Sequence, residues 1–179
     1  ENIPLRLYSG AEVFADPSNI RTLIEQHELI TLGGSRYLLV EFDFGLPGSV
    51  LLRTLEAIAQ RGLVPVVAHP ERYDAVQRDP GLAAWCFSRG MLLQLNKGSL
   101  LGLLGSRAEG TALHLLSHGL AHLIASDAHD DRFRTTGFRS LLPVLEPICH
   151  PDYIALLLHG NPRRILRDEP IPIPPLQSD

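Results

Sequence analysis

The sequence has little of what marks secreted, membrane-spanning or nucleic-acid-binding proteins. Its two cysteines, Cys86 and Cys149, cannot form the disulfide framework of a small secreted domain and favour a reducing, cytoplasmic compartment. No apolar run reaches the roughly 18 residues of a membrane-spanning helix. Sixteen basic residues against twenty acidic ones give a formal net charge of −4, which provides no positive footprint for nucleic acid or an anionic membrane.

A natural start is also missing, because the chain opens with Glu1 and its only methionine is Met91. No signal peptide precedes the first strand-like run, so we expect that the natural protein has residues before Glu1. Apolar residues make up 45% of the chain and charged residues 20%, which is typical of a globular protein. The length predicts one domain, here residues 1–169, followed by a proline-rich tail over residues 170–179.

Short apolar runs alternate with longer segments of helical period, which predicts an α/β fold with a parallel sheet covered by helices. The expected strands are residues 5–14, 36–42, 64–68, 92–96 and 122–125. The expected helices are residues 16–28, 47–61, 79–90 and 106–118, with shorter ones around Ser140, Asp152 and Asn161. A closed α/β barrel usually takes about 250 residues, so either the sheet is open or the first strands of a barrel precede Glu1.

Polar side chains follow each apolar run. They are Glu12, Glu41, His69, Asn96, Asp127 and His129. Because the carboxyl ends of parallel strands meet at one face of the sheet, these side chains should lie close together. Carboxylates combined with imidazoles suit Mn²⁺, Zn²⁺ or Fe²⁺. The pattern therefore predicts a metal site formed by all of them except Asn96, which we expect to tie down a loop.

Each candidate has a simpler alternative. Glu12 could solvate a strand end, Glu41 could form a salt bridge, and His69 could be a hydrogen-bonded core histidine. Arg72 follows His69 by three residues and Arg134 follows His129 by five. A guanidinium binds phosphate in a bidentate way, and the alternative for the two arginines is surface pairing with Glu71 or Asp130. No C-x5-R motif surrounds either cysteine, so a cysteine-nucleophile phosphatase is not expected.

These residues, in this order, resemble one bacterial family. The runs GAEV, RYLLVEF, VVAHPERY, NKGSLLG, IASDAH and HGNPRRIL, spread over residues 9–166, are similar to those of the manganese-dependent tyrosine phosphatases of the PHP (polymerase and histidinol phosphatase) superfamily. That family acts in capsular and exopolysaccharide synthesis. The resemblance implies a distorted seven-stranded α/β barrel with up to three Mn²⁺ ions, iron or zinc being alternatives. The implied metal ligands are Glu12, Glu41, His69, Asp127 and His129, and the implied phosphoryl-binding residues are Arg72 and Arg134.

The implied reaction is hydrolysis of phosphotyrosine by a metal-activated hydroxide, on a tyrosine kinase of polysaccharide assembly. The family opens with a strand carrying an Asp-x-His-x-His motif. This sequence lacks that motif, so the resemblance also implies that the first strands of the barrel are missing. Two other interpretations stay open. One is a phosphatase of histidinol phosphate or another small phosphomonoester, and the other is a truncated, catalytically silent binding module.

Overall fold

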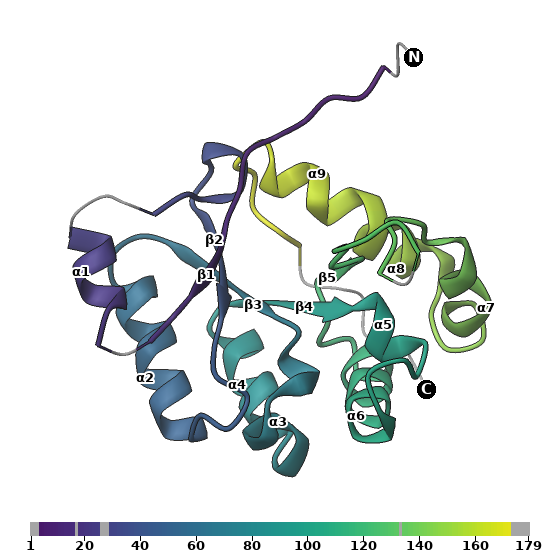
Figure 1. The fold of residues 1–179 in the computed structure, drawn as a ribbon, viewed down its shortest axis with the longest axis horizontal. Coiled ribbons are helices and arrows are strands. Elements are labelled where there is room, and N and C mark those ends of the chain that lie inside the picture. Colours follow the sequence, from purple (N-terminus) through teal and green to yellow (C-terminus); the bar gives the residue numbers. More distant parts are fainter. Residues whose placement is uncertain (1–3, 17, 26–28, 133, 173–179) are drawn as a thin grey trace.

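The computed structural model describes residues 4–16, 18–25, 29–132 and 134–172, and a parallel sheet of five strands forms the centre of this part (Figure 1). The strands are β1 (Glu12–Phe14), β2 (Tyr37–Glu41), β3 (Val64–Ala68), β4 (Leu92–Asn96) and β5 (Leu123–Ala125). They lie in sequence order, and each pairs in parallel with the next. Each strand is added next to the preceding one at the same edge of the sheet, and this order of strands also occurs in α/β barrels.

Helices connect and flank the strands. They are α1 (Ile20–Glu25), α2 (Gly48–Ala59), α3 (Asp74–Arg78), α4 (Gly81–Ser88), α5 (Lys97–Leu100), α6 (Ser106–Ser117), α7 (Leu142–Leu145), α8 (Pro151–Ala155) and α9 (Asn161–Ile165). Single turns of 3-10 helix lie at Leu32–Gly34, Pro70–Arg72 and Arg139–Leu141, and a π-helical turn, Leu156–Gly160, joins α8 to α9. Within the described ranges, every helix is too short or too polar to cross a membrane.

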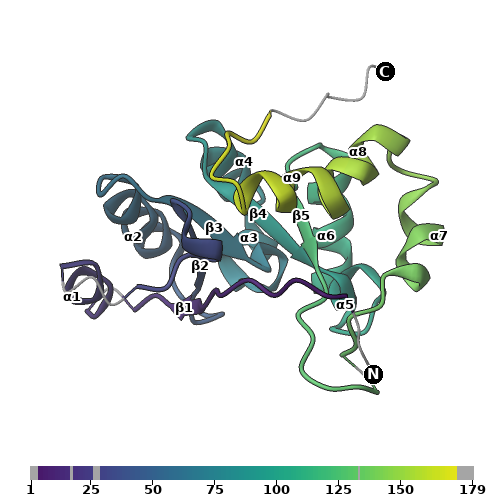
Figure 2. The same ribbon diagram turned by 90° about the horizontal axis from the view of Figure 1, so that it is seen from above.

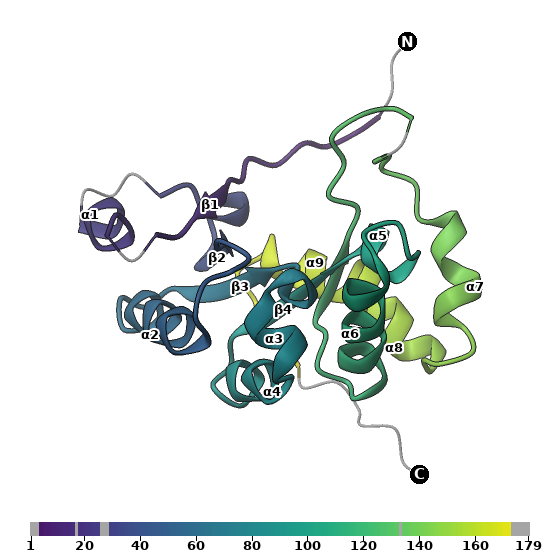
Figure 3. The same cartoon turned by 60° about the horizontal axis from the view of Figure 1, so that its bottom comes forward.

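The alternation of side chains along the strands divides the core into two layers. On one face, Leu38, Val67 and Leu93 are buried against α2, α4 and α6, which lie side by side beneath the sheet in Figure 3. On the opposite face, a smaller apolar cluster includes Val66 and joins the sheet to Ile165 of α9. Burial on both faces explains why the strands read as continuous apolar runs in the sequence.

The sequence prediction is confirmed for the four later strands and is largely wrong for the first. The run expected over residues 5–14 contains only the three-residue strand β1, and residues 4–11 leave it as an extended segment outside the sheet (Figure 2). Gly10 and Ala11 are poor strand formers, so the pairing of β1 with β2 stops at Glu12, although Tyr37 and Leu38 of β2 extend farther back in the same register. The alternation that predicted a strand therefore leaves Leu5 and Leu7 exposed.

Two helix boundaries and one expected cap also differ from the prediction. The helix expected over residues 16–28 is α1, Ile20–Glu25, and residues 26–28 lie outside the described residues. The helix expected from Asp79 begins at Gly81, whose N–H donates to Asp79 Oδ1 at 3.0 Å. Asn161 begins α9 as predicted but is not its cap, because α8, the π turn and α9 are continuous. Instead, its buried amide donates to the carbonyl oxygen of His122 at 2.8 Å.

The proline-rich tail is described only as far as residue 172. Residues 170–172 form neither helix nor strand, in agreement with the sequence prediction, and the remainder of the predicted tail lies outside the described residues.

His122, immediately before β5, is a buried histidine. The Leu93 N–H donates to His122 Nδ1 at 3.1 Å, and the His122 ring stacks on Phe87 with centroids 5.0 Å apart. Burial lowers the pKa of His122 from 6.5 to about 4. The imidazole is therefore a neutral core group that anchors β5 to β4, rather than a surface histidine.

The low pKa of His122 predicts a loss of stability in acid. Between about pH 6.5 and about pH 4 the unfolded chain binds a proton on His122 that the folded protein excludes, so the free energy of unfolding decreases by up to about 3 kcal/mol as the pH falls. We expect urea unfolding to show a steeper decline over this range for the wild type than for His122→Gln, which has no titrating group there. An equal decline in the free energy of unfolding of the two proteins would contradict the low pKa of His122.

Candidate functional site

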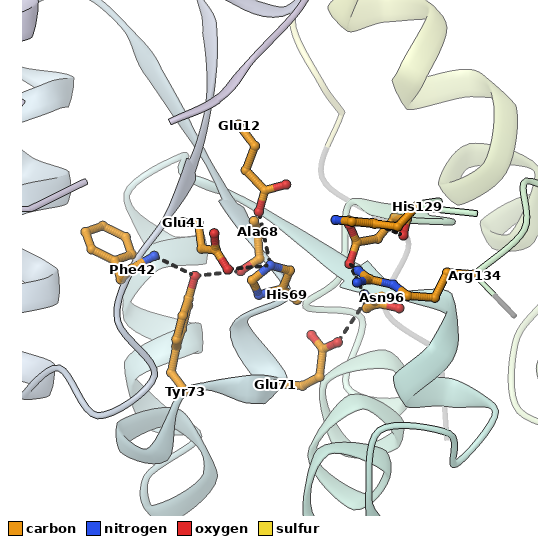
Figure 4. Close-up of polar contacts among 11 residues, drawn as sticks. Glu12, Glu41, Phe42, Ala68, His69, Glu71, Tyr73, Asn96, His129 and Arg134 are labelled. Carbon is orange, nitrogen blue, oxygen red and sulfur yellow. Dashed lines mark hydrogen bonds and ion pairs between the residues drawn. The ribbon is translucent and has the colours of Figure 1, made fainter. Parts of the chain in front are cut away.

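Two carboxylates and one imidazole converge at neighbouring strands of the sheet. His69 Nε2 lies 3.1 Å from Glu12 Oε1 and 3.4 Å from Glu41 Oε1. One potential ligand atom of each residue lies within 4.8 Å of the other two, and Figure 4 shows the three side chains pointing toward one another. Two oxygens and one nitrogen at this spacing fit a single divalent ion of the borderline type. This group of residues is hereafter called the Glu12–Glu41–His69 cluster.

The backbone holds His69 in an unusual conformation. His69 follows β3 with φ 34° and ψ 57°, the left-handed region that non-glycine residues rarely adopt. Its N–H donates to the Gln94 carbonyl oxygen at 2.8 Å, which ties it to β4. Asp127 also has a positive φ, 47°. Such conformations cost about 1–3 kcal/mol each and persist where the surrounding structure fixes them, often at functional sites. Two of the five predicted ligands, His69 and Asp127, thus have a left-handed backbone conformation.

Tyr73 joins the ends of the two strands that carry Glu41 and His69. Its buried hydroxyl accepts a hydrogen bond from the Phe42 N–H at 3.2 Å and donates one to the Ala68 carbonyl oxygen at 2.9 Å. Burial raises the pKa of this phenol, so the hydroxyl keeps its proton. Tyr73 therefore sets the spacing of the two strand ends and, through them, of the cluster.

Asp127 and His129 follow β5 and form a second group. Asp127 Oδ2 accepts a hydrogen bond from Asn96 Nδ2 at 2.7 Å and forms an ion pair with the Arg134 guanidinium. His129 Nδ1 donates to the Asp127 carbonyl oxygen at 2.9 Å, so Nε2 is the ring nitrogen that can accept a hydrogen bond or ligate an ion. Of the five predicted ligands, all of them in the described part of the chain, the structure brings three into one cluster and places Asp127 and His129 beside Arg134 instead.

The two arginines occupy different surroundings. The Arg72 guanidinium stacks on Phe44, 4.3 Å from the ring centroid, and the same ring contacts that of His69 with centroids 5.8 Å apart. The alternative pairing with Glu71 is wrong, because the Glu71 side chain is fully buried and accepts a hydrogen bond from the Asn96 N–H at 2.9 Å. Arg72 is thus held beside the cluster by an aromatic ring rather than by a carboxylate.

The Arg134 guanidinium forms an ion pair with Asp127, while the Arg134 backbone N–H donates to Asp130 Oδ1 at 3.2 Å. The structure thus adds Asp127 as a side-chain partner of Arg134, where the sequence suggested Asp130. A guanidinium has five N–H donors in a planar fork, so one bound carboxylate leaves donors for a further anion.

Sequence reasoning missed Glu71 and underestimated Asn96. Burial raises the pKa of the Glu71 carboxyl, and its Oε1 holds the N–H of Asn96. Asn96 caps α5 by accepting from the Gly98 N–H at 2.7 Å, which confirms its predicted role in tying down a loop, and it also binds Asp127. The position of Glu71 inside the AHPERY run was a signal that could have drawn attention to it.

The cysteines play no part in this site. Both are buried thiols, and burial raises the pKa of Cys86 to about 12 and that of Cys149 to about 11. Neither is a thiolate at neutral pH, which agrees with the expectation that the chemistry does not use a cysteine nucleophile. The fold and the site therefore define an α/β protein with a candidate divalent-metal cluster and two arginines suited to an anionic group.

Comparison with known proteins identifies the family. The model of the family described as "Capsular polysaccharide synthesis, CpsB/CapC" matches residues 1–167. The chain belongs to this family, which confirms the family-level resemblance seen in the sequence.

Relatives named as tyrosine-protein phosphatases agree with this assignment. The chain is 29% identical over 171 residues to the tyrosine-protein phosphatase YwqE of Bacillus subtilis (strain 168), a match covering 96% of the chain and 66% of YwqE. It is 28% identical over 165 residues to the tyrosine-protein phosphatase CpsB of Streptococcus pneumoniae, covering 89% of the chain and 68% of CpsB. The matches thus span about two thirds of each relative's length.

A solved structure has the same fold. It was described in a study of YwqE from Bacillus subtilis and CpsB from Streptococcus pneumoniae as "unique metal-dependent tyrosine phosphatases". It superposes with a TM-score of 0.85 at 28% sequence identity, over 99% of this chain and 71% of that one. The parallel α/β architecture is therefore shared with a metal-dependent tyrosine phosphatase.

Proposed function

We propose that this protein is a metal-dependent phosphotyrosine-protein phosphatase. The observation that carries the proposal is the convergence of Glu12, Glu41 and His69 on one point, with Arg72 held beside His69 by Phe44. The tyrosine phosphatase activity of the relatives supports it. The same reasoning favours a phosphorylated protein as substrate, and we propose a tyrosine kinase of polysaccharide assembly in the cytoplasm.

The cluster has the donor set for a divalent ion, and we propose Mn²⁺, with Asp127 and His129 as further ligands at neighbouring positions. When bound, such ions activate water as a nucleophile and neutralise charge on the phosphoryl oxygens. His69 presents Nε2 to this position, because Tyr73 and the Gln94 carbonyl oxygen fix the strand end and the backbone that carry it.

Arg72 and Arg134 are proposed to hold the phosphoryl group of the substrate. Phe44 supports one face of the Arg72 guanidinium, which keeps its N–H donors available for phosphoryl oxygens. Arg134 is oriented by Asp127 and binds the anion with its remaining donors. Two forks with five donors each match the oxygen-rich face of a phosphate better than two ammonium groups would.

We propose that the sheet forms part of a distorted seven-stranded barrel of the PHP type, within one domain over residues 1–169. The sequential parallel order of the strands supports this. On the face opposite α2, α4 and α6, a cavity of about 370 Å³ is lined by residues that include Gln94, Leu123 and Phe138. β1 is an edge strand of the described sheet, with β2 as its neighbour on one side, so its other edge has room for a further parallel strand.

The function is tested by turnover on two substrates. In the presence of Mn²⁺, we expect kcat/KM for a phosphotyrosine peptide to be at least about tenfold above that for histidinol phosphate. The reason is that both arginines must bind the phosphoryl group of phosphotyrosine, which is carried by a long aromatic side chain. The opposite preference would favour the small-substrate phosphatase. A complete lack of turnover on both, in a protein that binds metal, would favour the silent binding module.

Substitution of Arg72 by lysine tests its role directly. We expect Arg72→Lys to lower kcat/KM on the phosphotyrosine peptide at least about tenfold, because lysine keeps the positive charge but loses the bidentate fork. Metal content should be unchanged, since Arg72 contacts Phe44 rather than a ligand atom. Arg78→Lys is the matched control, because Arg78 is exposed and pairs with Asp74 one helical turn away. Normal turnover in Arg72→Lys would show that Arg72 has a surface role and does not bind the phosphoryl group.

A further inference from the structure

Lys97, the one lysine of the chain, is buried behind the loop that carries Asp127 and Arg134. Its side chain is charged, yet the residue is only 5% exposed. The ammonium group donates to the carbonyl oxygens of Thr135 and Gly137, the latter at 2.9 Å, and lies 5.9 Å from the ring centroid of Phe138. A buried ammonium is costly unless its donors are satisfied, so this arrangement requires the loop to keep its carbonyl groups turned inward.

The residue before Lys97 holds the other end of the same loop. Asn96 Nδ2 donates to Asp127 Oδ2 at 2.7 Å, while Glu71 Oε1 fixes the Asn96 backbone from below. Figure 4 shows Asn96 between Glu71 and the Arg134 side chain. Two consecutive residues at the end of β4 therefore contact the loop of residues 126–138 near its beginning and near its end.

Between the two anchors, residues 128–132 of this loop are exposed to solvent. Asp131 and Arg132 have side chains that are 95% and 83% exposed. The loop is closed at its base by the His129 N–H, which donates to the Arg134 carbonyl oxygen at 3.0 Å. Arg134 is the residue directly before Thr135, whose carbonyl oxygen accepts a hydrogen bond from Lys97.

We propose that Lys97 is a positioning residue for Arg134. By holding the carbonyl groups of Thr135 and Gly137, its ammonium sets the backbone from which the Arg134 guanidinium reaches toward an anionic group. The inference rests on the proposed function, which supplies the phosphoryl group that Arg134 binds. If Lys97 had a purely structural role, its replacement would remove a core contact. The effect would then extend over the whole domain and would not be confined to this loop and Arg134.

The first test measures the loop itself and does not depend on catalysis. In the full chain, Lys97→Met keeps an unbranched side chain that is one atom shorter and removes its donors. We expect amide hydrogen exchange of residues 127–137 to accelerate about tenfold or more, with exchange in β3 unchanged. Arg53→Met, which removes an exposed cation from α2, is the matched control and should leave the loop as in the wild type. Unchanged exchange of the loop in Lys97→Met would overturn the proposal.

The second test measures coupling between Lys97 and Arg134. We expect Lys97→Met to weaken the binding of inorganic phosphate, measured by calorimetry in the presence of Mn²⁺, about tenfold in the wild type but less than about twofold in an Arg134→Ala background. Equal weakening in both backgrounds would overturn the proposal. Phosphate binding that behaves as expected in a protein without turnover on phosphotyrosine would reject the proposed function while supporting the role of Lys97.

If Lys97→Met does not fold, Lys97→Gln replaces it in both tests. Glutamine retains N–H donors but loses the charge and the reach to both carbonyl groups, so the loop should again exchange faster and the coupling to Arg134 should again be lost. Lys97→Arg, which keeps the charge and the donors, is expected to recover most of the protection of the loop. Recovery with arginine but not with glutamine supports the proposal, and no difference among the three proteins overturns it.

Discussion

We expect exhaustive chelation with EDTA to abolish phosphotyrosine hydrolysis by this protein, and Mn²⁺ to restore it better than Mg²⁺. The reason is the donor set of the cluster, in which His69 Nε2 lies beside one oxygen each of Glu12 and Glu41. An imidazole nitrogen favours Mn²⁺, whereas Mg²⁺ prefers oxygen ligands and retains its water. The measurement is the initial rate on a phosphotyrosine peptide after chelation and after titration with each ion.

Two controls accompany this experiment. Circular dichroism of the chelated protein should show the secondary structure intact, so that the loss of rate reports on the ion rather than on unfolding. Titration with Zn²⁺ and Fe²⁺ ranks the alternatives that the same donor set allows. Full activity after exhaustive chelation would contradict a metal-dependent reaction.

The second large effect is expected for substitution of His69. Replacing residues that merely orient metal ligands typically lowers metal affinity or activity about 10–100-fold, so removing a ligand should lower both by more than about 100-fold. We choose His69→Asn, because asparagine tolerates the left-handed backbone at this position and leaves the fold unstrained. Mn²⁺ affinity by calorimetry and kcat/KM on the phosphotyrosine peptide should decrease together.

His159→Asn is the matched control for this variant, because His159 is exposed on the π-helical turn before α9 and is not one of the predicted ligands. It should leave metal affinity and turnover unchanged. If His69→Asn keeps both its Mn²⁺ affinity and its turnover, the ion binds at other residues. If it keeps its Mn²⁺ affinity but loses turnover, His69 contacts the substrate instead.

Local sequence patterns were sufficient for most of the fold. The strands β2 to β5 were predicted to within two residues, because a parallel strand buried on both faces is a continuous apolar run that needs no knowledge of distant residues. Helices α2 and α6 were predicted from their apolar period and the glycines that follow them. The convergence of Glu12, Glu41 and His69 followed from the rule that parallel strands place their carboxyl ends together, and the structure confirms it.

Local sequence patterns were not sufficient where the structure of a segment depends on a partner elsewhere in the chain. The alternating run of residues 5–14 describes an extended backbone, but a strand also needs a neighbour, and β2 pairs with only three of these residues. Asp127 and His129 have the right types and spacing for metal ligands, yet the structure pairs Asp127 with Asn96 and Arg134. Their role as ligands stays a prediction, which metal titration of Asp127→Asn can test.

The sequence by itself identified the candidate residues for the chemistry, whereas the tertiary structure decided which residues position them. The hydrogen bonds of Glu71 to Asn96, of Asn96 to Asp127 and of Lys97 to Thr135 join residues 25, 31 and 38 positions apart. A glutamate or lysine read in sequence is expected at the surface. Both are buried here because the fold brings polar partners to them from distant segments, and this satisfies groups that could not otherwise leave water. Such pairings follow from the packing of strands and loops and have no local signature.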